Sequence, residues 1–356
     1  KKPWMDDLDT DKLVDRPDLA AETRNFCNQP ITEGGTYNVV VGPRGCGKST
    51  MVQMALRGRP GVIKINIKDA DPLPQLMVAL GIYEAHRITD TGVAASQLKL
   101  AAEQPDVREV LGSTPVVIIA EVDSGLDQRV LRAASQQLKK FVDITKAARV
   151  VIVASDAVSA LALEKDMRQL FTWVDELTPG DFAHVLDKRK MFVPQTPGDA
   201  NDQMRQRLLQ LPRHPQSLVF VADLLAKKHL PCDASNPAVV KVLDDHIDQQ
   251  RASAYLNVKN LLRKEPRLIP LAKALLKTLV VRNDAAQGLT SEMEVDEVTG
   301  LLRKHRGLSY DVGAESWRIY SQLHRDAIER WFAERDAERN TKWGMWNQSR
   351  KKKDKK

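Results

Sequence analysis

The fold of this 356-residue chain is decided by the stretch Tyr37-Asn38-Val39-Val40-Val41-Gly42-Pro43-Arg44-Gly45-Cys46-Gly47-Lys48-Ser49-Thr50. Its first five residues form a short, largely apolar run that predicts a buried strand. The next nine match the spacing G-x-x-x-x-G-K-[ST], and a helical pattern over residues 50–57 follows. A strand before this motif and a helix after it are the context in which such a loop binds phosphate. The sequence therefore predicts a strand–loop–helix unit built around an anion site.

The residues of this loop suit the binding of a nucleoside triphosphate. Glycines allow a tight turn that directs several backbone N–H groups at phosphate oxygens, and the following helix adds its N-terminal dipole. Lys48 would neutralise the β- and γ-phosphates, and the Ser49 hydroxyl would be a ligand of Mg²⁺. A glycine-rich turn without a ligand is the alternative. We expect nucleotide contacts from Gly42, Pro43, Arg44, Gly45, Cys46, Gly47, Lys48, Ser49 and Thr50.

Short apolar runs alternate with amphipathic segments between residues 34 and 178. Four runs beyond the first predict further buried strands of a parallel sheet, at 62–67, 116–119, 150–153 and 171–174. Helical patterns lie between them, at 72–80, 93–110 and 128–144. The alternation predicts an α/β core of three layers, α/β/α, for residues 34–178.

A second functional position is expected where the third strand ends, at Ala120-Glu121-Val122-Asp123. In phosphoryl-transfer sites an aspartate that holds Mg²⁺ and a glutamate that polarises water usually follow such a strand. Here Ala120 takes the aspartate position. Glu121 is therefore the candidate base, or a shared metal and base residue, and Asp123 is a second candidate for the metal. The alternative is that hydrolysis is slow or lost and that the site only binds nucleotide.

Four further side chains are candidates with competing explanations. Ser155 follows a strand and could sense the γ-phosphate, or it could serve an ordinary turn. Arg168 could act on the nucleotide of a neighbouring subunit, or it could be a solvated surface arginine. His214 could close over the nucleotide, or it could belong to a plain helix–helix turn. Cys46 at a helix N-terminus could have a lowered thiol pKa, which would allow redox control, or it could simply be a small residue that the loop tolerates.

The composition changes on both sides of the α/β region. Residues 1–33 form a polar lead segment with a helical pattern over Pro17–Asn28. Thr178, as an N-cap before proline, opens a helical region at 179–252 that we assign as a lid. Residues 253–340 are helical with two short strands, which predicts a winged-helix-like domain. Residues 341–356 are polar and basic, and we expect a disordered tail.

The net charge of +7 belongs mostly to the C-terminal end. Residues 350–356 hold six positive charges and one negative, a net of +5, which leaves +2 for the rest. Three widely spaced cysteines exclude a disulfide framework, and no apolar run approaches the roughly 20 residues of a membrane helix. We expect a soluble intracellular protein without a membrane span, cytoplasmic or nuclear, with organellar import left open.

With these motifs in place, the chain resembles the ATPases of the AAA+ and STAND groups within the P-loop NTPases. More narrowly, it resembles archaeal-ATPase-like proteins and the NTPase modules of fungal and oomycete Crinkler-type proteins. The resemblance rests mainly on residues 42–50 and extends over 34–186, more loosely to 332. It implies a five-stranded parallel sheet with the strand before Lys48 beside the strand before Ser155, then a helical lid and a winged helix. It also implies ATP and Mg²⁺ as ligands and Glu121 as a catalytic residue.

We therefore expect an ATPase that acts as a nucleotide-dependent molecular switch. One alternative is a nucleotide-binding scaffold with little turnover, which Ala120 favours. Another is a nucleic-acid-associated ATPase that uses the winged helix and the basic tail, although the acidic residues of the expected recognition helix at 291–304 would repel phosphate. The expected partners are ATP, a protein that the sequence does not identify, and a second copy of the chain in a homo-oligomer.

Overall fold

The computed structural model of the protein describes residues 16–29, 31, 37–81, 90–112, 114–122, 126–154, 169–278, 280–282, 297, 308–311 and 314–353. Contacts within the chain divide it into two units. The first comprises Lys1–Gln195, Arg213–Asp233 and Asp311–Glu315. The second comprises Thr196–Pro212, Ala234–Tyr310 and Ser316–Lys356. Both units therefore draw on the helical region at 179–252.

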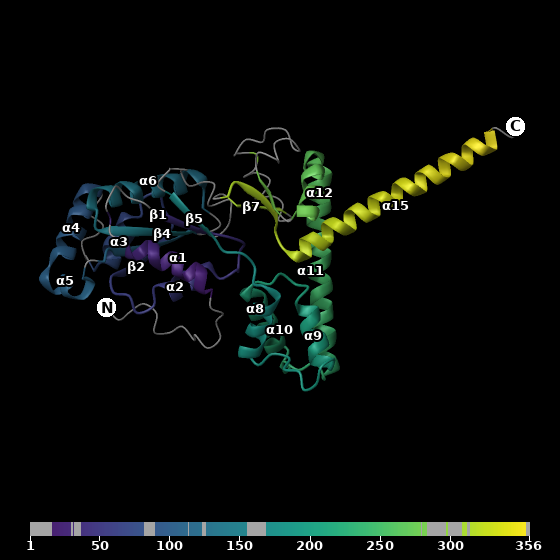
Figure 1. Ribbon diagram of the computed structural model, residues 1–356, viewed down its shortest axis with the longest axis horizontal. Helices are drawn as coiled ribbons and strands as arrows, with labels where there is room; N and C mark the ends of the chain where they lie inside the picture. Colours follow the sequence, from purple (N-terminus) through teal and green to yellow (C-terminus); the bar gives the residue numbers. More distant parts are fainter. Residues whose placement is uncertain are drawn as a thin grey trace. The chain divides into compact units, whose positions relative to one another are not determined.

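A five-stranded, entirely parallel sheet forms the centre of the first unit, with the strand order β2-β3-β4-β1-β5 (Figure 1). Its strands are β1 (Tyr37–Val41), β2 (Val62–Ile67), β3 (Val116–Val122), β4 (Ala148–Ala154) and β5 (Gln169–Trp173). Every residue of β1 and β4 is buried, because helices cover both faces of a parallel sheet. The predicted α/β fold is confirmed, and so is the position of β1 beside β4.

Strand β4 begins at Ala148, two residues before the predicted start. The prediction began too late because the charged Arg149 interrupts the apolar run by which a buried strand is identified in a sequence. The Arg149 guanidinium lies 5.1 Å from the centre of the Phe26 ring and donates to the carbonyl oxygen of Gln29 at 3.3 Å. A cation–π contact and a hydrogen bond offset part of the cost of burying the charge. Helix α1 thus makes a charged residue acceptable in a buried strand.

Helices form the two outer layers of this unit. Helices α1 (Pro17–Asn28) and α2 (Lys48–Ala55) pack against each other and share one hydrophobic cluster with strands β1, β3 and β4. Helix α6 (Gln128–Thr145) lies on the other side of the sheet in Figure 1, and α4 (Thr91–Glu103) packs against it. The shorter α3 (Leu73–Ala79) contacts β2. The three predicted layers are present.

The single helix predicted at 93–110 is two helices, α4 and α5 (Pro105–Leu111). Proline has no N–H and clashes with the preceding turn, so Pro105 ends one helix and begins the next. Asp90 accepts hydrogen bonds from the backbone N–H groups of Val93 and Gly92 at 3.1 and 2.6 Å, and these bonds lower the pKa of its carboxyl group. This cap moves the start of α4 to Thr91, ahead of the apolar periodicity.

Arg59, just after α2, ties α1 to the sheet. Its Nη2 donates to the carbonyl oxygens of Cys27 and Pro115 at 3.1 and 2.7 Å, and its Nε donates to Asn28 Oδ1 at 3.1 Å. Burial lowers the pKa of the Arg59 guanidinium. One side chain therefore joins three segments that are distant in the sequence.

Replacing Arg59 by alanine is expected to destabilise the first unit by about 2 kcal/mol, because two backbone carbonyls lose their donor. The measurement is urea unfolding followed by circular dichroism. Arg57→Ala, which removes an exposed arginine two positions earlier, is the control and should change stability by less than about 0.5 kcal/mol. Equal effects from the two variants would contradict this role for Arg59.

Two helices of the first unit follow the sheet. Helix α8 (Pro179–Lys188) has Thr178 as its N-cap, and the Thr178 hydroxyl accepts from the Asp181 backbone N–H at 3.1 Å, as predicted. Helix α10 (Pro215–Lys227) begins where the chain returns to this unit. Its start is joined to the end of β5 because the Leu177 N–H donates to the Arg213 carbonyl oxygen at 3.0 Å.

The second unit is mainly helical. It contains α9 (Ala200–Leu208), α11 (Pro237–Lys264), the 3₁₀ turn η3 (Pro266–Leu268), α12 (Ile269–Thr278) and α15 (Gln322–Lys353). A three-stranded sheet has the order β6-β8-β7, with β6 (Val280–Arg282), β7 (Leu308–Asp311) and β8 (Ser316–Ile319). The two strands predicted around the turn at 313–316 are therefore neighbours in a sheet. The expected recognition helix at 291–304 lies outside the described residues apart from Glu297, so the winged helix stays a prediction.

Helix α15 continues to Lys353, where a disordered tail was expected from residue 341. The helix is continuous in Figure 1. The segment contains no proline, and its lysines and arginines are good helix formers, so a helix that has already been nucleated can extend through it. The polar composition of residues 341–353 therefore did not predict their helical conformation.

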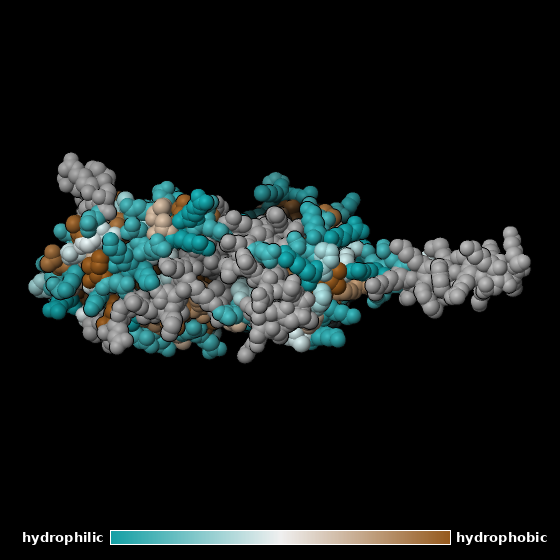
Figure 2. All heavy atoms as spheres, turned by 90° about the horizontal axis from the view of Figure 1, so that it is seen from above, coloured by the Kyte–Doolittle hydropathy of each residue, from teal (hydrophilic) through white to brown (hydrophobic). Residues whose placement is uncertain are grey.

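On the face shown in Figure 2, the coloured residues are mostly hydrophilic, and apolar side chains appear only in small patches among them. Among the residues that the structure describes, no helix is long and apolar enough to cross a lipid bilayer.

Candidate functional site

The loop between β1 and α2 has the backbone geometry that the motif predicts. Gly47 is the N-cap of α2 and has a left-handed conformation with φ of 93°, which favours glycine. A Cβ atom on Gly42 would come within 2.0 Å of the Val174 carbonyl oxygen. The first glycine is therefore required because the chain after β5 runs directly against the loop.

Lys48 is held by the loop itself. Its Nζ donates to the carbonyl oxygens of Gly42 and Pro43 at 2.9 and 2.8 Å, and the residue is only 7% exposed. The ammonium group therefore lies inside the curve of the loop, at the N-terminus of α2. Such a position suits a charge that is to meet phosphate oxygens arriving at the helix N-terminus.

A cavity of about 580 Å³ opens in front of the loop, within the usual range for ligand pockets. It brings together several predicted residues, namely Arg44, Gly45, Gly47, Lys48, Ser49, Thr50 and Glu121. Lys68 and Arg189 add two cationic side chains that the sequence did not single out. Glu121 is the only carboxylate in the described lining, against four cationic side chains. The cavity is therefore suited to a ligand with several negative charges.

Strand register places Glu121 on the same face of the sheet as α2. Glu121 pairs with Val153 and Val153 pairs with Val40, and residues directly opposite each other point to the same face. Val40 and Val153 belong to the cluster that packs against α2. Ala120 is completely buried and, by alternation, faces away from α2. Glu121, and not position 120, is thus the strand-end residue that faces Lys48 and Ser49.

Glu121 forms an ion pair with Lys64 of β2. The Lys64 Nζ and Glu121 Oε2 atoms are 2.7 Å apart, and the two side chains are 26% and 24% exposed. Glu121 lines the cavity in front of the loop, whereas Lys64 is not among its lining residues.

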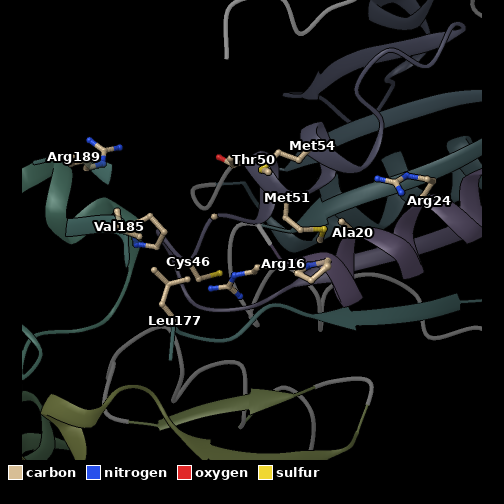
Figure 3. A pocket seen from close by; sticks show the side chains of 13 residues that line it. Arg16, Ala20, Arg24, Cys46, Thr50, Met51, Met54, Leu177, Val185 and Arg189 are labelled. Atoms are coloured by element: carbon tan, nitrogen blue, oxygen red, sulfur yellow. The ribbon is translucent and has the colours of Figure 1, made fainter. Parts of the chain in front are cut away.

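A second cavity of about 350 Å³ lies on the other side of the start of α2 (Figure 3). Its wall is largely apolar and includes Ala20, Met51, Met54, Leu177 and Val185. Gly47, Thr50, Arg189 and Pro215 line both cavities, so the two spaces meet at the loop. A ligand with a charged part and a flat apolar part could occupy both.

Arg16, at the N-cap of α1, is the most buried cation of the second cavity. Burial lowers the pKa of its guanidinium, and its Nη2 makes no hydrogen bond within the described structure. Figure 3 shows the Arg16 and Cys46 side chains close together at the base of this cavity. Arg24 also lines the cavity, but its Nε is bound to the Ala55 carbonyl oxygen at 3.1 Å.

Of the two explanations for Cys46, the lowered thiol pKa is contradicted by the structure. Cys46 is fully buried, and burial raises the pKa of its thiol in spite of the nearby charges of Lys48 and Arg16. Desolvation outweighs the helix N-terminus because the thiolate has no water around it. Cys46 therefore acts as a small packing residue beneath the loop.

Of the remaining predicted residues, His214 lies away from both linings. It is buried beside Glu176, with Nε2 and Oε1 3.4 Å apart, and the neighbouring Arg213 donates from Nε to the Leu177 carbonyl oxygen at 2.9 Å. These contacts hold the end of β5 against the start of α10. Pro215 and Gln216, which follow, are the residues that reach the cavities. Asp123, Ser155 and Arg168 lie outside the described residues.

Sequence reasoning missed Arg16, Arg189, Lys68 and Gln216. They lie before α1, at the end of α8, after β2 and at the start of α10. Their distances from residues 42–50 along the chain follow no regular spacing, so they carry no local signal. A polar residue directly after a buried strand, as at Lys68, was the one available indication.

No family model matches the chain, and no curated protein matches it. Solved structures with similar coordinates include Cdc6p from Pyrobaculum aerophilum, at 11% identity and a TM-score of 0.43, covering 92% of this chain and 99% of that one. Drosophila ORC bound to DNA has 13% identity and a TM-score of 0.42, covering 90% and 87%. A STAND protein with a tetratricopeptide repeat sensor from Pyrococcus horikoshii has 13% identity and a TM-score of 0.36, covering 89% and 42%. At these identities and TM-scores, no activity, ligand or partner of those proteins is assigned to this chain.

Proposed function

We propose that this protein binds ATP with Mg²⁺ at the loop after β1, hydrolyses it, and acts as a nucleotide-dependent switch. The observation that carries the proposal is the cavity in which Lys48, Ser49 and Glu121 meet at the N-terminus of α2. The triphosphate would lie against the loop N–H groups. Lys48 would exchange its loop carbonyls for the β- and γ-phosphates, and Arg189 would contact the phosphates from α8.

The residues present fit a magnesium ion. Ser49 and Glu121 offer the hard oxygen ligands that Mg²⁺ prefers, and the ion is normally completed by phosphate and water. The described residues hold no group of three or more His, Cys, Asp or Glu that would bind a metal without a ligand. When bound, Mg²⁺ would neutralise charge on the phosphates. Glu121 would orient the attacking water and accept its proton.

The base would occupy the second cavity, between the apolar side chains of α1, α2 and α8. No carboxylate or carboxamide side chain is among the described residues that line this cavity. Guanine presents N–H donors at two neighbouring positions, a ring N–H and an amino group, and would leave both without described side-chain acceptors, whereas adenine presents one amino group. Arg16 can donate to a ring nitrogen of the base. The lining therefore favours adenine.

Replacing Arg16 by alanine is expected to weaken ATP binding about tenfold, because one charge-assisted hydrogen bond contributes about 1.5 kcal/mol. The affinity is measured by isothermal titration calorimetry. Arg108→Ala, an exposed arginine on α5, serves as the control. An Arg16→Ala variant with the parent's ATP affinity would place the base elsewhere.

Switching would follow from the residues that α8 and α10 contribute to the cavities. Arg189, Pro215 and Gln216 come from outside the sheet. A nucleotide that contacts them would couple the loop to these helices, and loss of the γ-phosphate would remove some of those contacts.

A nucleotide-binding scaffold without useful turnover is the second candidate. The ion pair of Glu121 with Lys64 favours it, because the Lys64 ammonium occupies one of the two carboxylate oxygens that would contact the attacking water. Nucleotide extracted from purified protein after several hours distinguishes the two: a scaffold retains ATP, and an ATPase yields ADP. The homo-oligomer, the protein partner and nucleic-acid contact through the C-terminal end stay predictions, and the mass in solution with and without ATP tests the first of them.

A further inference from the structure

A third cavity, of about 300 Å³, lies between helices α11 and α15 of the second unit. The two helices pack against each other (Figure 1), and the cavity opens where the last turns of α11 and the turn η3 meet α15. The residues that line the two cavities at the phosphate loop all belong to the first unit. A volume of this size is at the lower end for ligand pockets and suits one inserted side chain with its neighbours.

Three cationic side chains line this cavity, Lys259 and Arg263 from α11 and Arg335 from α15. Arg263 is exposed in the last turn of α11, and it forms no ion pair with a described carboxylate. Arginine binds a carboxylate through two parallel N–H donors, so an arginine at the mouth of a cavity is suited to an arriving anion.

The carboxylates of the lining do not neutralise these cations. Glu334 accepts hydrogen bonds from the Tyr255 hydroxyl and from Arg330 Nε, the second at 2.9 Å, and these bonds lower the pKa of its carboxyl group. Its charge is therefore balanced by Arg330, which lies outside the lining. Glu338 is exposed one turn further along α15 and is the other carboxylate of the described lining. The cations thus outnumber the available carboxylates, and the cavity is suited to a negatively charged ligand.

The aromatic rings of the lining are already covered by cations. The Arg330 guanidinium and the Lys259 ammonium lie 4.5 and 5.4 Å from the centre of the Tyr255 ring. The Arg335 guanidinium lies 5.0 Å from the centre of the Trp331 ring, and Trp331 is only 8% exposed. A nucleobase would have to displace these cation–π contacts before it could stack. The rings therefore position the cations, and the cavity is poorly suited to a nucleic-acid strand.

An apolar wall lies beside Arg263. It consists of Leu262, which is only 2% exposed, Pro266, which is exposed, and Ile269, which is half-buried. An inorganic anion would leave this wall in contact with water. A peptide can place an aliphatic side chain against the wall and carboxylates at the arginines, so it uses both parts of the lining.

We propose that the cavity between α11 and α15 binds an acidic segment of a protein partner. An aliphatic side chain of the segment lies against Leu262, Pro266 and Ile269, and its flanking carboxylates contact Arg263 and Arg335. The site supplies the chemistry of the partner that a nucleotide-dependent switch requires. None of its residues lines the nucleotide cavities, so its test is independent of ATP binding.

The test measures the fluorescence anisotropy of a labelled peptide in which one leucine is flanked on each side by two glutamates and both ends are blocked. The full chain is used without nucleotide. The parent should bind this peptide, and Arg263→Ala and Arg335→Ala should each raise its Kd about tenfold, because each removes a charge-assisted contact. Lys264→Ala is the matched control and should retain the parent Kd, because this exposed lysine follows Arg263 directly but does not line the cavity.

Two further probes separate this site from general attraction between charges. The same peptide with lysines in place of its glutamates should not bind the parent, and it should bind the double variant Arg263→Glu with Arg335→Glu, a gain that a merely structural role of the arginines would not produce. A ten-nucleotide oligothymidylate should show no dependence on Arg263. The inference is overturned if the parent does not bind the glutamate peptide, or if Lys264→Ala weakens binding as much as Arg263→Ala does. Binding of the oligothymidylate that is lost in Arg263→Ala would assign the cavity to nucleic acid and also overturn it.

Discussion

Replacing Lys48 by alanine is expected to reduce ATP affinity at least about 100-fold, because the triphosphate loses a charge-assisted contact at a site with little water. Lys48 is only 7% exposed and lies within the curve of the loop. Among the described residues that line the cavity, the other lysine is Lys68, which follows β2 and does not belong to α2. The affinity is measured by calorimetry with ATP and Mg²⁺.

The control for this variant must distinguish the loss of the contact between Lys48 and phosphate from a change in the conformation of the loop. Lys48 donates to Gly42 and Pro43, so alanine could loosen the loop as well as remove the charge. Lys48→Met retains most of the side-chain volume, and its thermal unfolding should lie close to that of the parent. Parent-like ATP affinity in both variants would show that the loop is not the phosphate site.

Replacing Glu121 by glutamine is expected to reduce ATP turnover about 100-fold or more while ATP still binds, because the amide cannot accept a proton from water. Phosphate release under single-turnover conditions gives the rate of the chemical step. Glu103→Gln, an exposed glutamate at the end of α4, is the matched control and should hydrolyse at the parent rate.

Two outcomes of this experiment have different meanings. If Glu121→Gln hydrolyses ATP as fast as the parent, the catalytic role of Glu121 is wrong. If the parent itself shows no turnover but retains ATP, the scaffold function is supported, and the ion pair with Lys64 is its first explanation.

The local elements were predictable because they are short and strongly patterned. The bounds of β1 and β2 agree with the predicted runs, and Thr178 caps α8 as its sequence context predicts. The misjudged elements have particular causes. Arg149 is a buried charge that only α1 makes acceptable, and Pro105 divides a region whose apolar periodicity continues across it.

The residues of the candidate site likewise divide into those that the local sequence predicts and those that only the packing of separate elements brings together. Residues 42–50 could be proposed as a phosphate site because the whole loop is one contiguous segment of glycines, lysine and serine. The alternative of a lowered Cys46 thiol pKa failed because that pKa depends on burial, which the neighbours of Cys46 in the sequence do not report. Arg16 and Arg189 were missed because each joins the cavity through the packing of a separate helix.

The sequence by itself determined the α/β alternation, the loop between β1 and α2, and the candidate residues for phosphate binding, since each depends on neighbours along the chain. Only the tertiary structure decided which strand-end residue faces α2 and which side chain meets it. Glu121 faces α2 and Ala120 does not because of the strand register, and Lys64 reaches Glu121 because β2 lies beside β3. Side chains 57 positions apart come into contact only when backbone hydrogen bonds align the two strands, and that alignment is a property of the assembled sheet.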